Sequence, residues 1–459
     1  MIGLIFSESF INTGIKAFLI SYIGSRENLP NGKLIAYVAA MDGIQQFLAI
    51  FIHHLATDHI GDFGVIIVTL PWVIFGLGTL WLSSVLEYKQ MGKPMLYIAL
   101  VILLVGLAGI QVSLEDFLSQ HFEDETIVVD ETRSERQQEE EYQDIVEGRT
   151  SLWSNGAGFL GTFICWMFSS SLNWKQTIIT SLIEVVVAYL LFICGKRFYL
   201  RIPPTQRTTV SRLKEARELV KLIPLWLLFI PYCLAEVASF SIFILQSERL
   251  DTRINPRINP RISLDNSFNN VPVSSLYVFN HFISFLVSMS TKYLIRNIWN
   301  SEEAMQRGAR YWRMGVGMAF GFGSLLSAWL VERRRSDLIK KNPNDEEDIP
   351  MTILWLAPQF GLLGIANGLV VEGLRDFFND RVPKSKQYFE MLFNQSLKVI
   401  ASFLSGLAVL LAPDWFDHTM NKCQLDKYLL MLAILNVVVL PLYIFLSLKF
   451  DWNVPDEVD

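Results

Sequence analysis

The sequence predicts an all-α membrane protein of about 12 transmembrane helices, arranged as two six-helix bundles. Of the 459 residues, 51% are apolar and only 18% are charged, whereas soluble domains carry about 25% charged residues. The apolar residues form nearly unbroken blocks, such as Val399–Leu411 and Leu429–Leu448. Because a bilayer core about 30 Å thick requires about 20 apolar residues per helix, blocks of this kind are expected to span it.

Twelve segments fit this requirement and are predicted to be helical spans: Ile2–Ile23, Leu34–Leu55, Gly64–Ser84, Pro94–Val112, Ser151–Leu172, Gln176–Gly195, Leu219–Leu245, Val271–Ile295, Met314–Val331, Met351–Val371, Phe389–Ala412 and Tyr428–Leu448. The first lacks a basic start and a cleavage site, so it is interpreted as a span and not as a signal peptide. Basic residues separate the sixth span from the seventh. We therefore predict an N-terminal bundle at 1–196, a cytosolic linker at 197–218 and a C-terminal bundle at 219–459.

Three segments between the spans have distinctive compositions. Leu114–Gly148 is acidic and is expected to be solvated and partly helical. Arg253–Ile262 reads RINPRINPRI, and its Asn-Pro steps favour turns. Thr208–Lys221 has an amphipathic helical pattern that is typical of a membrane surface. With a net charge of −6 and no basic stripe, the sequence does not indicate nucleic-acid binding.

The cysteines do not have the spacing of a metal site, and no tightly bound metal or cofactor is expected. Three of the four lie in apolar stretches, where a free cysteine behaves as a small apolar residue. They are Cys165, Cys194, Cys233 and Cys423.

An ordered series of short motifs carries a family resemblance. These motifs are SESFINTG at 7–14, NGKLIAYVAAMDGIQ at 31–45, GLAGIQVSLEDFLSQHFE at 106–123, GKRFYLRIPP at 195–204 and PVSSLYVFN at 272–280. Together they resemble the plant nitrate transporter/peptide transporter family, the proton-dependent oligopeptide transporter branch of the major facilitator superfamily. The chain is shorter than most members and is interpreted as a divergent, shortened one. The resemblance implies the major facilitator fold.

The resemblance also implies where ionisable residues are expected. The family has an E-x-x-E-R motif in the first span, a Lys in the fourth and a Glu in the tenth. Here the first motif reads Ile5 to Ser9 and keeps only the acid Glu8, the Lys position is Gln111, and the Glu position is Asn367. An unpaired buried charge is costly, so loss of the acidic residues is expected to be accompanied by loss of the basic ones. Proton coupling is therefore predicted to be weakened or moved.

The family's gating-loop motif, A-D-x-x-x-G-R, follows the second span. Here it reads ATDHIGD, so the predicted gating residues are Asp58, Gly61 and Asp62. The basic residue of the family has become acidic at Asp62.

Other charged residues occur within the predicted spans. Glu8, Asn12 and Lys16 recur at every fourth position and form a polar stripe that we expect to face a central cavity; alternatively, Lys16 extends outward by itself. Glu236 of the seventh span and Lys398 of the eleventh lie on helices that are neighbours in the family, so an ion pair is predicted. The alternative is a Lys398 that reaches the interface.

Glu8, Asn12, Lys16, Gln111, Glu236, Asn367 and Lys398 are together predicted to form the substrate or proton pathway. Glu184, in the sixth span, has no evident partner in the sequence and is expected on the lipid side.

The resemblance implies a secondary transporter and not an enzyme. It would move a small anionic or zwitterionic solute of the nitrate, peptide or hormone class by alternating access, with or without protons, in a plant plasma or vacuolar membrane. Leu234 replaces the His of some nitrate carriers, and Asn12 and Thr13 replace the Tyr pair of peptide carriers. The sequence therefore favours neither substrate.

Two alternatives remain open at the level of the sequence. The first is a transport-incompetent relative, either a sensor or a decaying duplicate, because several coupling positions differ from the family. The second, more remote, is a membrane acyltransferase. His53 and Asp58 have the H-x-x-x-x-D spacing that pairs a general base with its orienting acid, although two-residue motifs often occur by chance.

Overall fold

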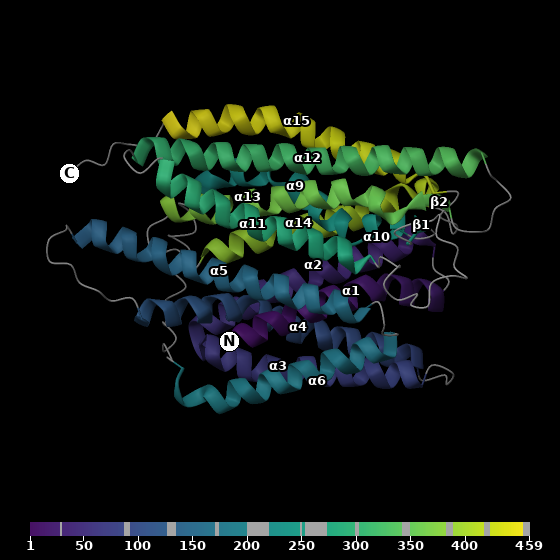
Figure 1. The fold of residues 1–459 in the computed structure, drawn as a ribbon, viewed down its shortest axis with the longest axis horizontal. Helices are drawn as coiled ribbons and strands as arrows, with labels where there is room; N and C mark the ends of the chain where they lie inside the picture. The colour runs from purple at the N-terminus through teal and green to yellow at the C-terminus, as the bar shows by residue number, and fades with distance from the viewer. Residues whose placement is uncertain are drawn as a thin grey trace, which may run out of the picture. The chain divides into compact units, whose positions relative to one another are not determined.

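The computed structural model describes residues 1–27, 30–86, 92–125, 135–169, 174–199, 220–247, 250–252, 273–298, 303–341, 349–381, 389–416 and 423–452. Its long helices are α1 (Ile2–Glu27), α2 (Asn31–Leu55), α3 (Asp62–Val85), α4 (Gly92–Glu125), α5 (Glu135–Ser169), α6 (Trp174–Cys194), α11 (Ser274–Ile298), α12 (Glu303–Lys341), α13 (Ala357–Arg381), α14 (Phe389–Leu411) and α15 (Leu425–Trp452), as Figure 1 shows. A further helix is broken into α8 (Ile223–Leu227), α9 (Ile230–Ser239) and α10 (Ile242–Ser247).

Shorter elements connect these helices. They are the π-helical turn η1 (Ala56–Ile60), the 3-10 turns η2 (Gly195–Arg197), η3 (Val220–Leu222), η4 (Ile353–Leu356) and η6 (Pro413–Trp415), and the strands β1 (Leu250–Asp251) and β2 (Ile349–Thr352). The two strands pair in parallel, with Leu250 opposite Ile349.

Each predicted span overlaps a helix or, for the seventh, a series of short helices, and the prediction of an all-α membrane protein is confirmed. Among the described residues, 9 helical segments are long and apolar enough to cross a membrane. The other three predicted spans lie in α1, α5 and α11, which are also helical over more than 20 residues.

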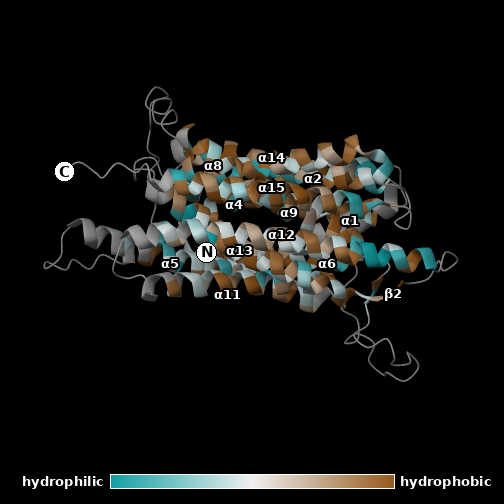
Figure 2. Cartoon of the chain, turned by 90° about the horizontal axis from the view of Figure 1, so that it is seen from above, coloured by the Kyte–Doolittle hydropathy of each residue, from teal (hydrophilic) through white to brown (hydrophobic). Residues whose placement is uncertain are grey.

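The helix surfaces are apolar where a soluble protein would be polar. Leu411 of α14 is 75% exposed, Leu191 of α6 68%, Phe445 of α15 65% and Phe75 of α3 63%. In Figure 2, hydrophobic residues run along the middle of the long helices. Exposed apolar surface of this extent is expected when hydrocarbon chains and not water cover the helices.

Several helices are longer than the sequence predicted. The helix α4 continues to Glu125, beyond the predicted end at Val112, and α12 extends on both sides of Met314–Val331. The reason is that hydropathy marks only the hydrocarbon crossing, while a helix continues into water until a residue stops it. The acidic segment Leu114–Gly148 is accordingly helical up to Glu125 and again from Glu135. The segment Arg253–Ile262 and residues 208–219 of the predicted amphipathic helix lie outside the described residues.

The predicted seventh span is present as a candidate membrane span at Ile223–Ser247, but its helix is interrupted twice. The amides of Leu228 and Phe229 donate to carbonyls three residues earlier, as do those of Phe240 and Ser241. Pro231 follows the first interruption, and a proline cannot donate the next helical hydrogen bond. Short 3-10 stretches within a helix often mark a hinge. The middle segment, α9, carries Glu236.

The chain divides into two compact units. The first comprises Met1–Ile15 and Ile44–Thr209, and the second comprises Lys16–Gly43 and Val210–Asp459. In the first unit α3 packs against α4 and α6, and Phe63, Phe117 and Phe192 form an aromatic cluster with Tyr199. In the second, α12 packs against α13 and α15 (Figure 1), and α11 packs against α13. The predicted bundle boundaries at 196 and 219 remain a prediction.

Gly61 closes the turn between η1 and α3 with a φ of 76°. Its amide donates to the carbonyl of Ala56 over 2.8 Å. A side chain at positive φ costs about 1–2 kcal/mol, so Gly61→Ala is expected to lower the free energy of unfolding by about that amount. Gly78→Ala is the matched control, because the space beside Gly78 within α3 is open. Denaturant titration of both variants measures the difference, and equal stabilities would contradict the expectation.

Candidate functional site

Glu236 and Lys398 form an ion pair inside the second unit. The Nζ atom of Lys398 on α14 donates to Oε1 of Glu236 on α9 over 3.2 Å. Their side chains are 33% and 19% exposed, respectively. The predicted pair is therefore present. Both side chains are only partly buried.

A second carboxylate lies near the same lysine. Lys398 interacts electrostatically with Asp42 of α2, and the Asp42 carboxylate accepts a 2.9 Å hydrogen bond from Ser402. Lys398 and Ser402 are one turn apart and therefore share a face of α14. One lysine thus interacts electrostatically with acids from two helices, and with all three groups ionised the set carries a charge of −1.

Asn367, at the predicted tenth-span position, is hydrogen-bonded to the face of α9 that carries Glu236. Its Oδ1 accepts a 2.7 Å hydrogen bond from the hydroxyl of Tyr232, one turn before Glu236. Tyr232 itself is buried. Glu236 also interacts electrostatically with His281 of α11. The structure thus brings Glu236, Lys398 and Asn367 together, and it adds Asp42 and His281.

Gln111 of α4 occupies the predicted fourth-span position in the first unit. It accepts a 3.1 Å hydrogen bond from Nε2 of Gln45 and donates one of equal length to Oε1 of Gln46. Both partners are buried residues of α2. A side-chain amide both donates and accepts hydrogen bonds. The two glutamines of α2 therefore give Gln111 a donor and an acceptor, and this neutral array contains no charged group.

The residues predicted on α1 lie in differing surroundings. Glu8 is partly buried, and the Oδ1 atom of Asn12 is buried and accepts no hydrogen bond from the described residues. The side chain of Lys16 lies outside the described side chains, so its direction stays a prediction.

The interpretation that Glu184 has no partner is corrected by the structure. Ser7 of α1 donates a 2.5 Å hydrogen bond to Oε1 of Glu184, while Oε2 is buried without a hydrogen bond to the described residues. A carboxyl group from α6 therefore contacts the turn of α1 next to Glu8.

The predicted gating residues lie at the junction of α2 and α3. Asp58 belongs to η1, and its side chain lies outside the described ones. Asp62 begins α3 and accepts a 2.7 Å hydrogen bond from Gln120 of α4. His53 lies 3.7 Å from the carboxylate of Asp116 on α4. The described contact of His53 is therefore with α4, and the pair with Asp58 stays a prediction.

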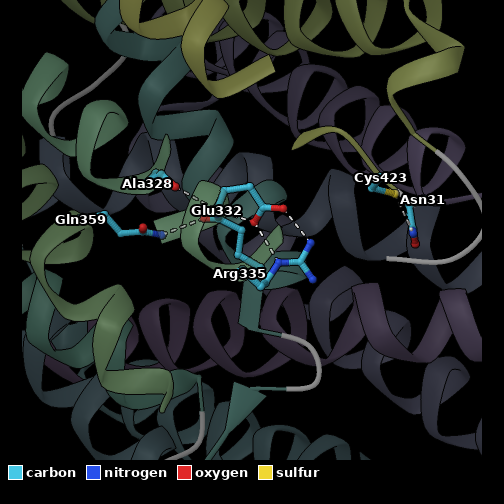
Figure 3. A network of polar contacts seen from close by, with 7 residues as sticks. Asn31, Ala328, Glu332, Arg335, Gln359 and Cys423 are labelled. Atoms are coloured by element: carbon cyan, nitrogen blue, oxygen red, sulfur yellow. Dashed lines mark hydrogen bonds and ion pairs between the residues drawn. The ribbon is translucent and has the colours of Figure 1, made fainter. Parts of the chain in front are cut away.

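A second polar cluster, which no sequence pattern indicated, lies in the C-terminal third of α12. Arg335 donates to both carboxylate oxygens of Glu332, at 3.0 and 2.7 Å. Gln246 of α10 donates to Glu332 and to the carbonyl of Ala328, and Gln359 of α13 donates to Gln246. Figure 3 shows Glu332, Arg335 and Gln359 converging, with Asn31 and Cys423 in a separate contact. Glu332 and Arg335 are 0% and 1% exposed, so this cluster holds three helices together and is not open to solutes.

Among the described residues no cluster of His, Cys, Asp and Glu could hold a metal ion. No disulfide joins Cys165, Cys194, Cys233 or Cys423.

Comparisons with known proteins agree with this architecture. A family model described as PTR2, POT family, matches residues 205–424. Protein NRT1/ PTR FAMILY 5.7 of Arabidopsis thaliana is 21% identical over 99% of this chain and 88% of that protein. Protein NRT1/ PTR FAMILY 5.11, also of Arabidopsis thaliana, is 22% identical over 97% of this chain and 92% of that protein.

Solved structures share the fold. A POT family transporter in complex with 5-aminolevulinic acid superposes with a TM-score of 0.71 at 11% identity, over 98% of this chain and 95% of that one. An auto-inhibited POT family peptide transporter gives a TM-score of 0.67 at 14% identity, over 100% and 97% of the two chains.

The fold and the apolar helix surfaces define a multi-pass integral membrane protein with the architecture of secondary transporters. The chain carries a PTR2/POT family domain at residues 205–424 and has homologues in the NRT1/PTR family of Arabidopsis thaliana, as the ordered motifs predicted.

Proposed function

We propose that this chain is a secondary transporter of a small anionic or zwitterionic solute, working by alternating access. The observation that carries the proposal is the Glu236–Lys398 ion pair. Glu236 lies on α9 of the interrupted helix and is 19% exposed, and Lys398 lies on α14 and is 33% exposed. A charge within a membrane helix costs about 2.5–3.5 kcal/mol and is retained mainly where it has a function. An ion pair that water can reach can open and offer its charges to a solute.

The polar groups near the pair favour this class of solute. Lys398 supplies a cation for a carboxylate or nitrate. Glu236, Asp42 and the amide of Asn367 supply acceptors for an ammonium group or a proton. We infer that proton binding, if retained, has moved to this set, because Gln111 and its two glutamine partners are neutral at the family's lysine position.

A transport-incompetent relative, either a sensor or a decaying duplicate, is the second candidate. The observation that favours it is the same neutral array on α2 and α4, together with Ile5 and Ser9 in the first motif. Solute binding without translocation would distinguish this candidate from a carrier.

Uptake into oocytes expressing the full chain tests the proposal. The probes are isotopically labelled nitrate, dialanine and 5-aminolevulinic acid, each supplied with and without an inward pH gradient. We expect accumulation of at least one probe several-fold above water-injected oocytes. The absence of uptake of every probe, by protein shown to be at the cell surface, would contradict transport of these solute classes and favour the second candidate.

A further inference from the structure

Three consecutive arginines in the C-terminal third of α12 have different environments. Arg335 is buried against Glu332, whereas Arg333 and Arg334 are exposed. The guanidinium carbon of Arg334 lies 4.0 Å from the ring centroid of Trp355, and that of Arg333 lies 5.5 Å from that of Trp329. Both cations thus rest on indole rings.

These two guanidinium groups lack an anionic partner within the described part of the chain. Glu332 is already bound by Arg335, and exposed Asp337 forms no ion pair with a described residue. A stacked guanidinium keeps its in-plane N–H donors available for two parallel bonds to a phosphate or carboxylate. Lys340 and Lys341 add positive charge about two turns farther along the helix.

The position of the arginines corresponds to a membrane interface. The apolar run Met314–Val331 precedes them; at 1.5 Å per residue its 18 residues cover about 27 Å, close to the thickness of the hydrocarbon core. Tryptophans are enriched at such boundaries. The buried network of Glu332, Arg335, Gln246 and Gln359 fixes this end of α12 to α10 and α13.

Apolar side chains lie beside the cations. Leu330 is 55% exposed, Leu354 45% and Trp355 43%. A ligand matching both features has an anionic head and a hydrocarbon tail. We propose that Arg333, Arg334, Trp329 and Trp355 form a binding site for the head group of an anionic glycerophospholipid, whose acyl chains cover Leu330 and Leu354.

Native mass spectrometry of the full chain in detergent tests this site, with dioleoylphosphatidylglycerol and dioleoylphosphatidylcholine as probes. We expect the double variant Arg333→Gln/Arg334→Gln to bind the phosphatidylglycerol about tenfold more weakly than the native chain, because each basic residue near the surface contributes to anionic-lipid affinity. The variant Trp355→Leu keeps both charges and is expected to weaken binding about threefold, through loss of the stacking surface.

The matched control is Lys33→Gln/Arg149→Gln, which removes two exposed cations elsewhere on the chain. Thermal unfolding of each variant establishes that it is folded. An equal loss of affinity in the control, or unchanged affinity in the arginine variant, would overturn the proposal. Equally tight binding of phosphatidylcholine would also overturn it. Displacement of the lipid by equimolar inorganic phosphate would show a general anion site and would contradict the lipid assignment.

Discussion

Replacing Arg335 with methionine is expected to lower the free energy of unfolding by about 3–5 kcal/mol, because breaking a buried ion pair leaves an uncompensated charge. Arg335 is 1% exposed, and its partner Glu332 is 0% exposed. The remaining carboxylate would keep one hydrogen bond, from Gln246. Titration of the purified protein with sodium dodecyl sulfate measures the change.

The double variant Glu332→Leu/Arg335→Met distinguishes a lost pair from lost packing. Replacing both charges with apolar groups of similar size is often neutral or stabilising, so this variant is expected to be more stable than the single one. Arg333→Met is the matched control, since Arg333 is exposed and its removal leaves the pair intact. A single variant as stable as this control would contradict the assignment of a buried, stabilising pair.

Replacing Lys398 with methionine is expected to reduce uptake of any transported probe at least tenfold. The change leaves Glu236 and Asp42 without the lysine that interacts with both, and a charge within a membrane helix costs about 2.5–3.5 kcal/mol. Lys398 is also the cation that we propose an anionic solute contacts. Uptake is measured in oocytes and normalised to protein at the cell surface.

A second ion pair on α14 gives the matched control. Arg375 of α13 lies 3.4 Å from Glu390 of α14, and these side chains are 21% and 20% exposed. Arg375→Gln is expected to leave most of the uptake intact. The variant Glu236→Gln/Lys398→Gln, which removes both charges, should be inactive but as stable as the native chain to within about 1 kcal/mol. Native-level uptake by Lys398→Met would show that this lysine does not contribute.

The fold was largely predictable from the sequence, because apolar blocks of bilayer length determine where helices cross a membrane. Hydropathy could not predict that α4 reaches Glu125, since a helix leaving the membrane becomes polar without ending. It also missed the interruptions around α9. Pro231 was a local signal for the first interruption, whereas the second, at Phe240 and Ser241, has no proline beside it.

The candidate site was only partly predictable. The Glu236–Lys398 pair followed from two charges on helices that are neighbours in the family. Asp42 was missed because a single acid in a span does not reveal which helix it faces. Ser7 and Glu184 are far apart in the chain, and only tertiary packing brings them together.

In α4 the sequence reveals a substitution but not the residues that surround it. Replacement of a family lysine by Gln111 was visible in the sequence, and so was the loss of charge. Gln45 and Gln46, which complete the neutral array, are unremarkable as single residues. Their contribution depends on the packing of α2 against α4, which no local pattern specifies.

The measurement that tests alternating access most directly does not require a known substrate. Asn394→Cys, one turn before Lys398 on α14, is placed in a chain whose cysteines at 165, 194, 233 and 423 are replaced by serine, and a membrane-impermeant methanethiosulfonate reagent is applied to either face of oriented membrane vesicles. If α9 and α14 expose this position alternately, the cysteine is modified from both faces. Modification from one face only, or from neither, would contradict the account.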